Sequence, residues 1–202
     1  NKLQMSADAS TNHATRLFNV PFSLDGNLSV NNINTLVETH RVTVLSGKTL
    51  YGDASSLTGK YVSGAGTTEI TSLQADSQLN QINTEIVNVT SSSDITFTGT
   101  FPTGTNTTTT VTSGKTLTLT ASLANEETIA GDGTTAITAL NASADLENVN
   151  STTVNIAVSE NVTFEGKFPK TTNATTTVDS GKTLTLAASK ASEERITGSG
   201  SV

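Results

Sequence analysis

Thr110 to Ser122 reads TVTSGKTLTLTAS, and Thr177 to Ser189, one 67-residue period later, reads TVDSGKTLTLAAS. A third version, TVLSGKTLYGDAS, lies one period earlier at Thr43 to Ser55. Around the first pair, residues 94–135 align with residues 161–202 without a gap and are identical at 26 of 42 positions. A period kept without insertions predicts structural units stacked on one another, because each repeat then contacts its neighbours in the same way.

The period divides the 202-residue chain into three repeats, at approximately 1–67, 68–134 and 135–202. We expect these repeats to form one continuous array and not a set of separate domains. Asn1 has the same phase in the repeat as Thr68, Thr135 and Val202, so the sequence begins and ends within a repeat. Because both ends fall within a repeat, we expect the sequence to be an excerpt of a longer chain, whose signal, anchor or effector domains lie outside it.

The composition points to a narrow core. Hydrophobic residues are 34% of the chain and aromatic residues 4%, which is little for a large globular interior. Threonine is abundant, and Gly, Asn and Ser punctuate the sequence, a combination typical of short strands and tight turns. The net charge of −7 and the 3 prolines are lower than disordered chains of this size usually carry. The sequence therefore predicts an ordered all-β protein.

Alternating residues identify the strands. In residues 115–120 polar and apolar residues alternate, so Leu117 and Leu119 face one side and the threonines face the other. Apolar positions recur with the period at Val44, Val111 and Val178; Leu50, Leu117 and Leu184; Val20, Val87 and Val154; Phe22, Val89 and Ile156; and Leu28, Ile95 and Val162. These patterns predict a parallel β-helix-like β-solenoid, in which each repeat makes about three coils of about 22 residues.

Two variants of this architecture stay open. Tandem small β-sandwich domains are the alternative fold, although a 67-residue unit is short for an immunoglobulin-like sandwich of about 100 residues. Residues 142–150 (ASADLENVN) have the spacing of one or two helical turns, with Leu146 and Val149 facing inward. A coil that mixes strands with a short helix is therefore also compatible with the sequence.

The residue types give no support to catalysis. The chain has no cysteine, which excludes disulfides and thiolate chemistry. His13 and His40 do not recur in the other repeats and have no visible ligand partners. Calcium-binding arrays need recurring carboxylates, but Gly131-Asp132-Gly133 corresponds to Gly64-Ala65-Gly66 and Gly198-Ser199-Gly200. We therefore expect no enzyme activity, cofactor or metal site, and we expect these glycines to serve a turn that needs either a positive φ or a close backbone approach.

The sequence also gives no support to binding of ice or nucleic acid or to insertion in a membrane. Thr116, Thr118 and Thr120 suit an ice-binding face, but such a face needs the motif in every adjacent coil, and the motif is seen once per period. Ordinary β-propensity explains these threonines. The scattered Lys and Arg residues form no basic stripe for nucleic acid. No segment approaches the roughly 18 apolar residues of a membrane span.

The phrase T-V-x-S-G-K-T-L-T-L-x-A-S at 110–122 and 177–189, followed by I-x-G-x-G at 129–133 and 196–200, resembles repeat arrays of large secreted bacterial surface proteins. The similarity is to the stalks of repetitive adhesins and to proteins of the S-layer type. It implies an extracellular or cell-surface location, a structural and non-catalytic role in a stiff rod, stalk, surface layer or filament, and copies of the chain or neighbouring repeats as partners.

The alternative function is binding. A Phe-Pro pair interrupts the second and third repeats, and proline breaks a ladder, so we expect a loop at each position. In a carbohydrate-binding or host-binding adhesin, or a phage-type fibre, these loops would present the contact surface, with surface glycan as a partner. The candidate binding residues are Phe101, Pro102, Phe168 and Pro169.

Overall fold

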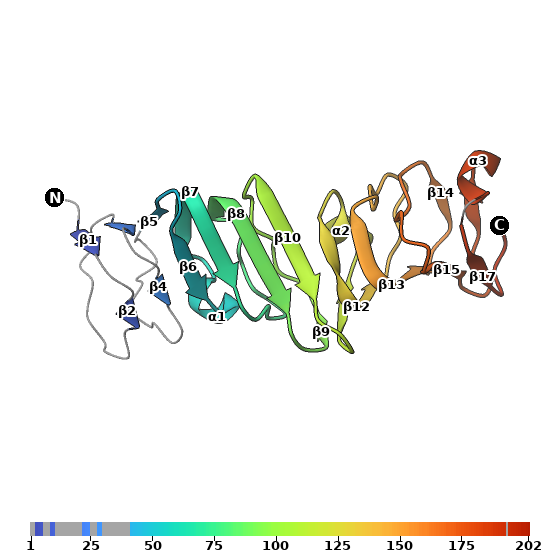
Figure 1. The fold of residues 1–202 in the computed structure, drawn as a ribbon. Helices are drawn as coiled ribbons and strands as arrows, with labels where there is room; N and C mark the ends of the chain where they lie inside the picture. Colours follow the sequence, from blue (N-terminus) through green and yellow to red (C-terminus); the bar gives the residue numbers. More distant parts are fainter. Residues whose placement is uncertain (1–2, 6–8, 11–21, 25–27, 30–40, 193) are drawn as a thin grey trace. The chain divides into compact units, whose positions relative to one another are not determined.

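In a computed structural model, the structure describes residues 3–5, 9–10, 22–24, 28–29, 41–192 and 194–202. The fold is an all-β parallel β-solenoid of about 8 turns, called coils below, with little helix (Figure 1). This confirms the predicted fold class. Tandem β-sandwich domains are the wrong alternative, because the ladders between the described strands are parallel, as strands of successive coils must be.

Short strands alternate with turns along the chain. The strands before residue 92 are β1 (Leu3–Met5), β2 (Ala9–Ser10), β3 (Phe22–Leu24), β4 (Leu28–Ser29), β5 (Arg41–Val44), β6 (Thr49–Gly52), β7 (Tyr61–Ile70) and β8 (Ile82–Ser91). Those that follow are β9 (Ile95–Thr96), β10 (Asn106–Val111), β11 (Thr116–Leu119), β12 (Ile129–Ile137), β13 (Val149–Val158), β14 (Val162–Phe164), β15 (Ala174–Val178), β16 (Leu184–Leu186) and β17 (Ile196–Gly198).

Three single-turn helices follow β6, β11 and β16: α1 (Ala54–Leu57), α2 (Ala121–Ala124) and α3 (Ala188–Ala191). Asp53 caps α1 by accepting a hydrogen bond from the Ser56 amide, and Thr120 caps α2 through the Leu123 amide. Ala187 begins α3 without a side-chain cap. The helix considered for residues 142–150 does not form, because this segment consists of turns that lead into β13.

The chain forms two compact units by its contacts, and each is described by itself. The first comprises Asn1–Thr90 and Thr98–Thr108, and the second comprises Ser91–Phe97 and Thr109–Val202. In the first unit, Val42 pairs with Val62 and Val62 pairs with Ile82, so the two coils have the same length. In the second unit the ladder runs from Ile95 through Leu117, Thr135 and Val154 to Ala174, and the length of the coil varies from step to step.

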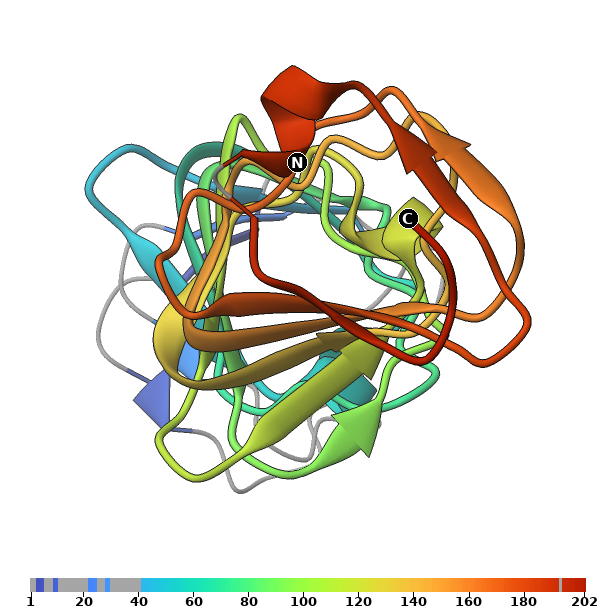
Figure 2. The same ribbon diagram turned by 90° about the vertical axis from the view of Figure 1, so that its right-hand side faces the viewer.

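The coil and the sequence period are not in phase. Three ladder steps from Ile95 reach Val154, whereas the residue one period after Ile95 is Val162, eight positions further along the chain. Each repeat therefore makes three coils and part of a fourth, and equivalent residues of successive repeats lie at different positions around the solenoid. Figure 2 shows this within the second unit, where α2 and α3 lie at different places around the coils.

The buried columns consequently differ from the periodic series in the sequence. Leu117 and Leu184 are both fully buried, as predicted, but Leu117 stacks between Ile95 and Thr135, and Leu184 stacks on Val162. Val20 lies outside the described residues. The inward positions of the described strands from Val42 onward are mainly Val, Leu and Ile, and Phe97 and Phe164 complete the interior. Such columns bury apolar surface between adjacent coils, which explains the low aromatic content.

The recurring Gly-x-Gly is explained by close approach of two backbones. Gly64, Gly131 and Gly198 have φ angles of 121°, 111° and 109°, and a Cβ atom on any of them would overlap the carbonyl oxygen of Val44, Val111 or Val178. In the first two copies the ladder register shifts directly after this glycine. The glycines therefore allow the bulge at which each long strand bends, and the predicted close approach is confirmed.

Candidate functional site

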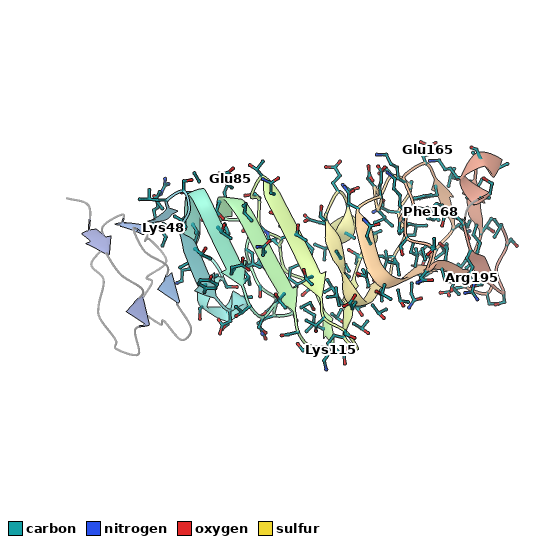
Figure 3. All side chains as sticks on the ribbon, in the orientation of Figure 1. Lys48, Glu85, Lys115, Glu165, Phe168 and Arg195 are labelled. Carbon is teal, nitrogen blue, oxygen red and sulfur yellow. The ribbon has the colours of Figure 1, made fainter. Side chains whose placement is uncertain are left out.

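The four predicted binding residues are buried. Phe101 and Phe168 are 7% and 9% exposed, and Pro102 and Pro169 are also buried. The ring of Phe168 packs against Phe164, with 4.4 Å between ring centroids and a 47° angle between planes. Figure 3 marks Phe168 together with Glu165, whose side chain is exposed. The aromatic faces are therefore part of the interior, and the surface of each loop consists of the polar residues around the Phe-Pro pair.

In the second unit an ion-pair network joins the Phe168 loop to the preceding coil. Lys167 Nζ lies 2.8 Å from Asp145 Oδ2 and 2.8 Å from Glu147 Oε2, and Lys170 pairs with Glu147 as well. Hydrogen bonds from Lys167 and then Lys170 lower the pKa of Glu147 to about 2. The hydrogen bond from Lys167 likewise lowers the pKa of Asp145 and raises that of Lys167 itself. The network holds the loop against its neighbouring coil.

The corresponding loop of the first unit uses neutral groups at all four positions. Thr100 Oγ1 donates to Gln78 Oε1 at 3.3 Å, and Thr103 Oγ1 donates to the Asn80 carbonyl oxygen at 3.3 Å. Gln78, Asn80, Thr100 and Thr103 lie one period before Asp145, Glu147, Lys167 and Lys170. The same backbone arrangement therefore carries either charged or neutral side-chain pairs.

A cavity of about 490 Å³ lies beside the Phe168 loop and is lined by Phe168, Lys170, Lys190 and Arg195 among others. Lys190 Nζ donates to the carbonyl oxygens of Gly166 and Glu165, at 2.5 and 3.1 Å, and lies 5.9 Å from the Phe164 ring centroid. Three cationic residues of the lining, Lys167, Lys170 and Lys190, are thus engaged within the protein. The positive charge available to a ligand in this cavity is smaller than its lining residues indicate.

The first unit has a cavity of about 310 Å³, and its polar lining belongs to successive coils. The lining residues include Arg41, Tyr61, Gln81, Asn83 and Thr103. Arg41, Tyr61 and Gln81 are each one coil apart, but none of them recurs with the 67-residue period. The only sequence signal for this group is the spacing of one coil between its members. This spacing can be recognised only when the length of the coil is known.

Small uncharged residues cover the outer side of one sheet in the second unit, here called the threonine face. Ladder pairing forms three rows across its strands: Thr116, Thr134 and Thr153; Thr96, Thr118, Ala136, Asn155 and Thr175; and Ala157, Thr177 and Thr197. The rows take their residues from segments that are one coil apart in the sequence. The Thr-x-Thr motif of Thr116 and Thr118 does not recur on the neighbouring strand, which has Thr134 and Ala136 at these positions.

The acidic positions considered for metal binding do not converge. Asp132 is exposed, and the described residues contain no group of three or more His, Cys, Asp or Glu placed to hold a metal ion. His13 and His40 lie outside the described residues. Burial raises the pKa of the half-buried Glu127 to about 7, and this carboxyl group is not part of any cluster in the described part of the chain. A search of the described helices found none that is long and apolar enough to span a membrane.

Comparison of the whole chain with protein-family models, with curated proteins and with solved structures found no match.

Proposed function

We propose that this chain is a structural, non-catalytic segment of an extracellular or cell-surface protein, in which stacked coils form a stiff rod, stalk, surface layer or filament. The observation that carries the proposal is the parallel ladder from Ile95 to Ala174, which is repeated coil after coil. Each coil is hydrogen-bonded and packed mainly to its two neighbours, so the length of such an assembly grows with the number of repeats.

The comparison of repeats supports the same proposal. The glycines that permit the bulge recur as Gly64, Gly131 and Gly198. Two buried aliphatic positions also recur, as Val44, Val111 and Val178 and as Leu50, Leu117 and Leu184. Charged positions change freely, as the neutral and charged versions of the Phe-Pro loops show. The repeats therefore preserve the means of stacking coils and not a chemical group at a fixed place.

Small-angle scattering on chains of one, two and three repeats tests the structural role. Coils stack about 4.8 Å apart, so each added repeat should lengthen the particle by about 15 Å at constant cross-section. A maximum dimension that instead grows with the cube root of chain length would contradict a rod. Antibody labelling of intact cells of the native host tests the extracellular location, and labelling only after lysis would overturn it.

The partners we propose are copies of the chain or neighbouring repeats of the same protein. The threonine face suits side-by-side contact, because none of the residues in its three rows is charged, while the chain as a whole carries a net charge of −7. Sedimentation at increasing concentration tests this, with Thr118→Lys as the disrupting variant and Thr185→Lys, on the separate β14–β16 sheet, as control. A wild-type chain that stays monomeric throughout would contradict self-association.

The second candidate function is a glycan-binding adhesin or phage-type fibre. The observation that favours it is the presence of a polar cavity beside each Phe-Pro loop, with Thr103 lining one and Lys170 the other. Binding of immobilised glycans by the chain, lost on substitution of lining residues, is the expected result. Binding that survives these substitutions would place the contact elsewhere.

A further inference from the structure

Several asparagines of the chain stand in the pattern Asn-x-Ser or Asn-x-Thr, the acceptor sequence for attachment of glycans to asparagine. They are Asn27, Asn88, Asn106, Asn141, Asn150, Asn161 and Asn173. A chain this rich in Asn, Ser and Thr contains several such sequences by chance, so the pattern alone assigns no site. Asn27 lies outside the described residues, and the structure and the repeat together separate the others.

Three of these asparagines use their side chains to hold the fold. The Asn88 amide donates to Glu69 Oε1 at 2.7 Å, and the Asn161 side-chain oxygen accepts a hydrogen bond from the Thr183 amide at 2.9 Å. Asn141 is hydrogen-bonded through both its side-chain nitrogen and its side-chain oxygen. Such a structural role explains the presence of these three residues without a glycan.

Two of the remaining asparagines occupy the same place in successive repeats. Asn106-Thr107-Thr108 lies one period before Asn173-Ala174-Thr175, so the asparagine and the threonine are kept while the residue between them changes. That middle residue is the one that the acceptor pattern leaves free. Asn150 is also exposed, but Asn83, one period earlier, is followed by Glu85 where the hydroxyl group is needed. Asn106 and Asn173 therefore form the only described pair that recurs with its acceptor pattern.

Both recurring asparagines lie where a strand begins and point to solvent. Asn106 is the first residue of β10, and Asn173 directly precedes β15 (Figure 1). Both are exposed, whereas Ala174, the next residue after Asn173, is buried. Residues two apart in a strand point to the same side, so Thr108 and Thr175 point outward together with their asparagines. The amide and the hydroxyl group of each acceptor pattern are thus reached from the same outer side of the coil.

The side-chain amides are available for a new bond. Asn173 forms no side-chain hydrogen bond with any described residue. Asn106 Nδ2 donates to the Glu85 carbonyl oxygen at 3.3 Å, and this nitrogen carries two hydrogen atoms, of which one stays after a sugar is attached. A glycan at either position therefore needs no loss of a hydrogen bond between described residues.

We propose that Asn106 and Asn173 are attachment sites for N-linked glycans. In the reaction a bond forms between the asparagine Nδ2 and C1 of the first sugar of a lipid pyrophosphate-linked oligosaccharide. The bond between C1 and the pyrophosphate breaks, the lipid pyrophosphate leaves, and one amide proton passes to a base of the transferase. Such acceptor sequences are used in exported proteins, so the inference rests on the extracellular location proposed above.

Mass spectrometry of peptides from the chain purified from its native host tests the proposal, with fragmentation placing the sugar on a particular residue. We expect a glycan on Asn106 and on Asn173, and none on the half-buried Asn88, whose amide is bonded to Glu69. Unmodified Asn106 and Asn173, or equal modification of Asn88, would overturn the assignment.

Matched variants made in the same host test whether attachment depends on the acceptor pattern. Thr175→Val removes the hydroxyl group and leaves Asn173, so the fraction of Asn173 that carries a glycan should fall about tenfold. Thr175→Ser keeps the hydroxyl group and should keep that fraction within about threefold of wild type. Valine suits an outward strand position, so the fold is kept. Thr108→Val and Thr108→Ser provide the same comparison for Asn106, and a glycan that survives both valine substitutions would overturn the proposal.

Failure of this inference is distinguishable from failure of the proposed location. Antibody labelling of intact cells together with unmodified Asn106 and Asn173 would remove the glycan sites and leave the extracellular role in place. Labelling only after lysis would overturn the location, and with it the route by which a glycan is added.

Discussion

Val42 and Thr109 occupy equivalent inward positions one period apart, and the threonine buries a hydroxyl group that has no hydrogen-bond partner among the described residues. Thr176, one period further along the chain, buries its hydroxyl group in the same way. Valine has nearly the shape of threonine, so the first repeat shows that the position accepts a methyl group. The two later repeats therefore carry a polar group that costs stability without contributing a contact.

Replacement of Thr109 or Thr176 by valine should raise the free energy of unfolding by about 1 kcal/mol each, because the desolvated hydroxyl group is removed. Thr135 provides the matched control, since its Oγ1 lies 2.6 Å from Ser151 Oγ in a buried pair. Thr135→Val should lower stability by about 1 kcal/mol, as Ser151 loses its partner. Chemical denaturation measures the free energy of unfolding of all three variants. A lower value for Thr109→Val than for wild type would contradict the interpretation that its unpaired hydroxyl group costs stability.

Glycines with positive φ should differ in their tolerance of a side chain. Gly131 and Gly114 have φ angles of 111° and 70°, but a Cβ atom would overlap the Val111 backbone only at Gly131. Gly114→Ala should cost about 1 kcal/mol, the usual cost of a positive φ for alanine. Gly131→Ala should cost about 3 kcal/mol or more, because backbone atoms must shift. Similar melting temperatures for the two variants would show that close approach is unimportant.

Glu127 should make stability depend on pH. Burial raises its pKa from 4.5 to about 7 in the folded chain, so the folded state binds the proton more tightly than the unfolded state. The free energy of unfolding should therefore fall as pH rises through this window, by about 1 kcal/mol after allowance for solvent screening. Glu127→Gln should be the more stable chain above pH 7 and should converge with wild type below pH 4.5. Parallel pH curves would contradict a buried carboxyl group.

The charged loop of the second unit can be converted to the neutral set of the first. The fourfold variant with Asp145→Gln, Glu147→Asn, Lys167→Thr and Lys170→Thr should fold, because the first unit holds the same arrangement with these residues. Wild-type stability should fall as acid protonates Glu147, whose pKa is lowered to about 2, and should decrease with added salt. The variant should lose both effects, and equal salt dependence would show that the ion pairs contribute nothing.

The sequence predicted the local structure of each coil well. Alternation at Leu117 and Leu119 predicted a half-buried strand, and the recurring Gly131 and Gly198 predicted a close backbone approach. Both depend on a few consecutive residues, for which side-chain direction and φ are nearly fixed by chemistry.

The pairing of coils was not predictable in the same way. The step from Ile95 to Leu117 is longer than the step from Leu117 to Thr135, so no single spacing identifies neighbours. The threonine face and the group around Arg41 depend on this pairing and were therefore missed. Phe101 and Phe168 were expected at a contact surface, but loop position alone does not determine which way a large apolar side chain points, and burial is the favourable direction.

Disulfide trapping tests the central claim, that neighbours in this repetitive chain are one coil apart and not one period apart. The chain has no cysteine, so Thr118→Cys can be paired either with Ala136→Cys, its ladder partner, or with Thr185→Cys, its equivalent one period later. Adjacent strands lie about 4.8 Å apart, within the range that a disulfide spans. We expect rapid oxidation to an intramolecular disulfide for 118 with 136 and none for 118 with 185, and the reverse result would contradict the solenoid described here.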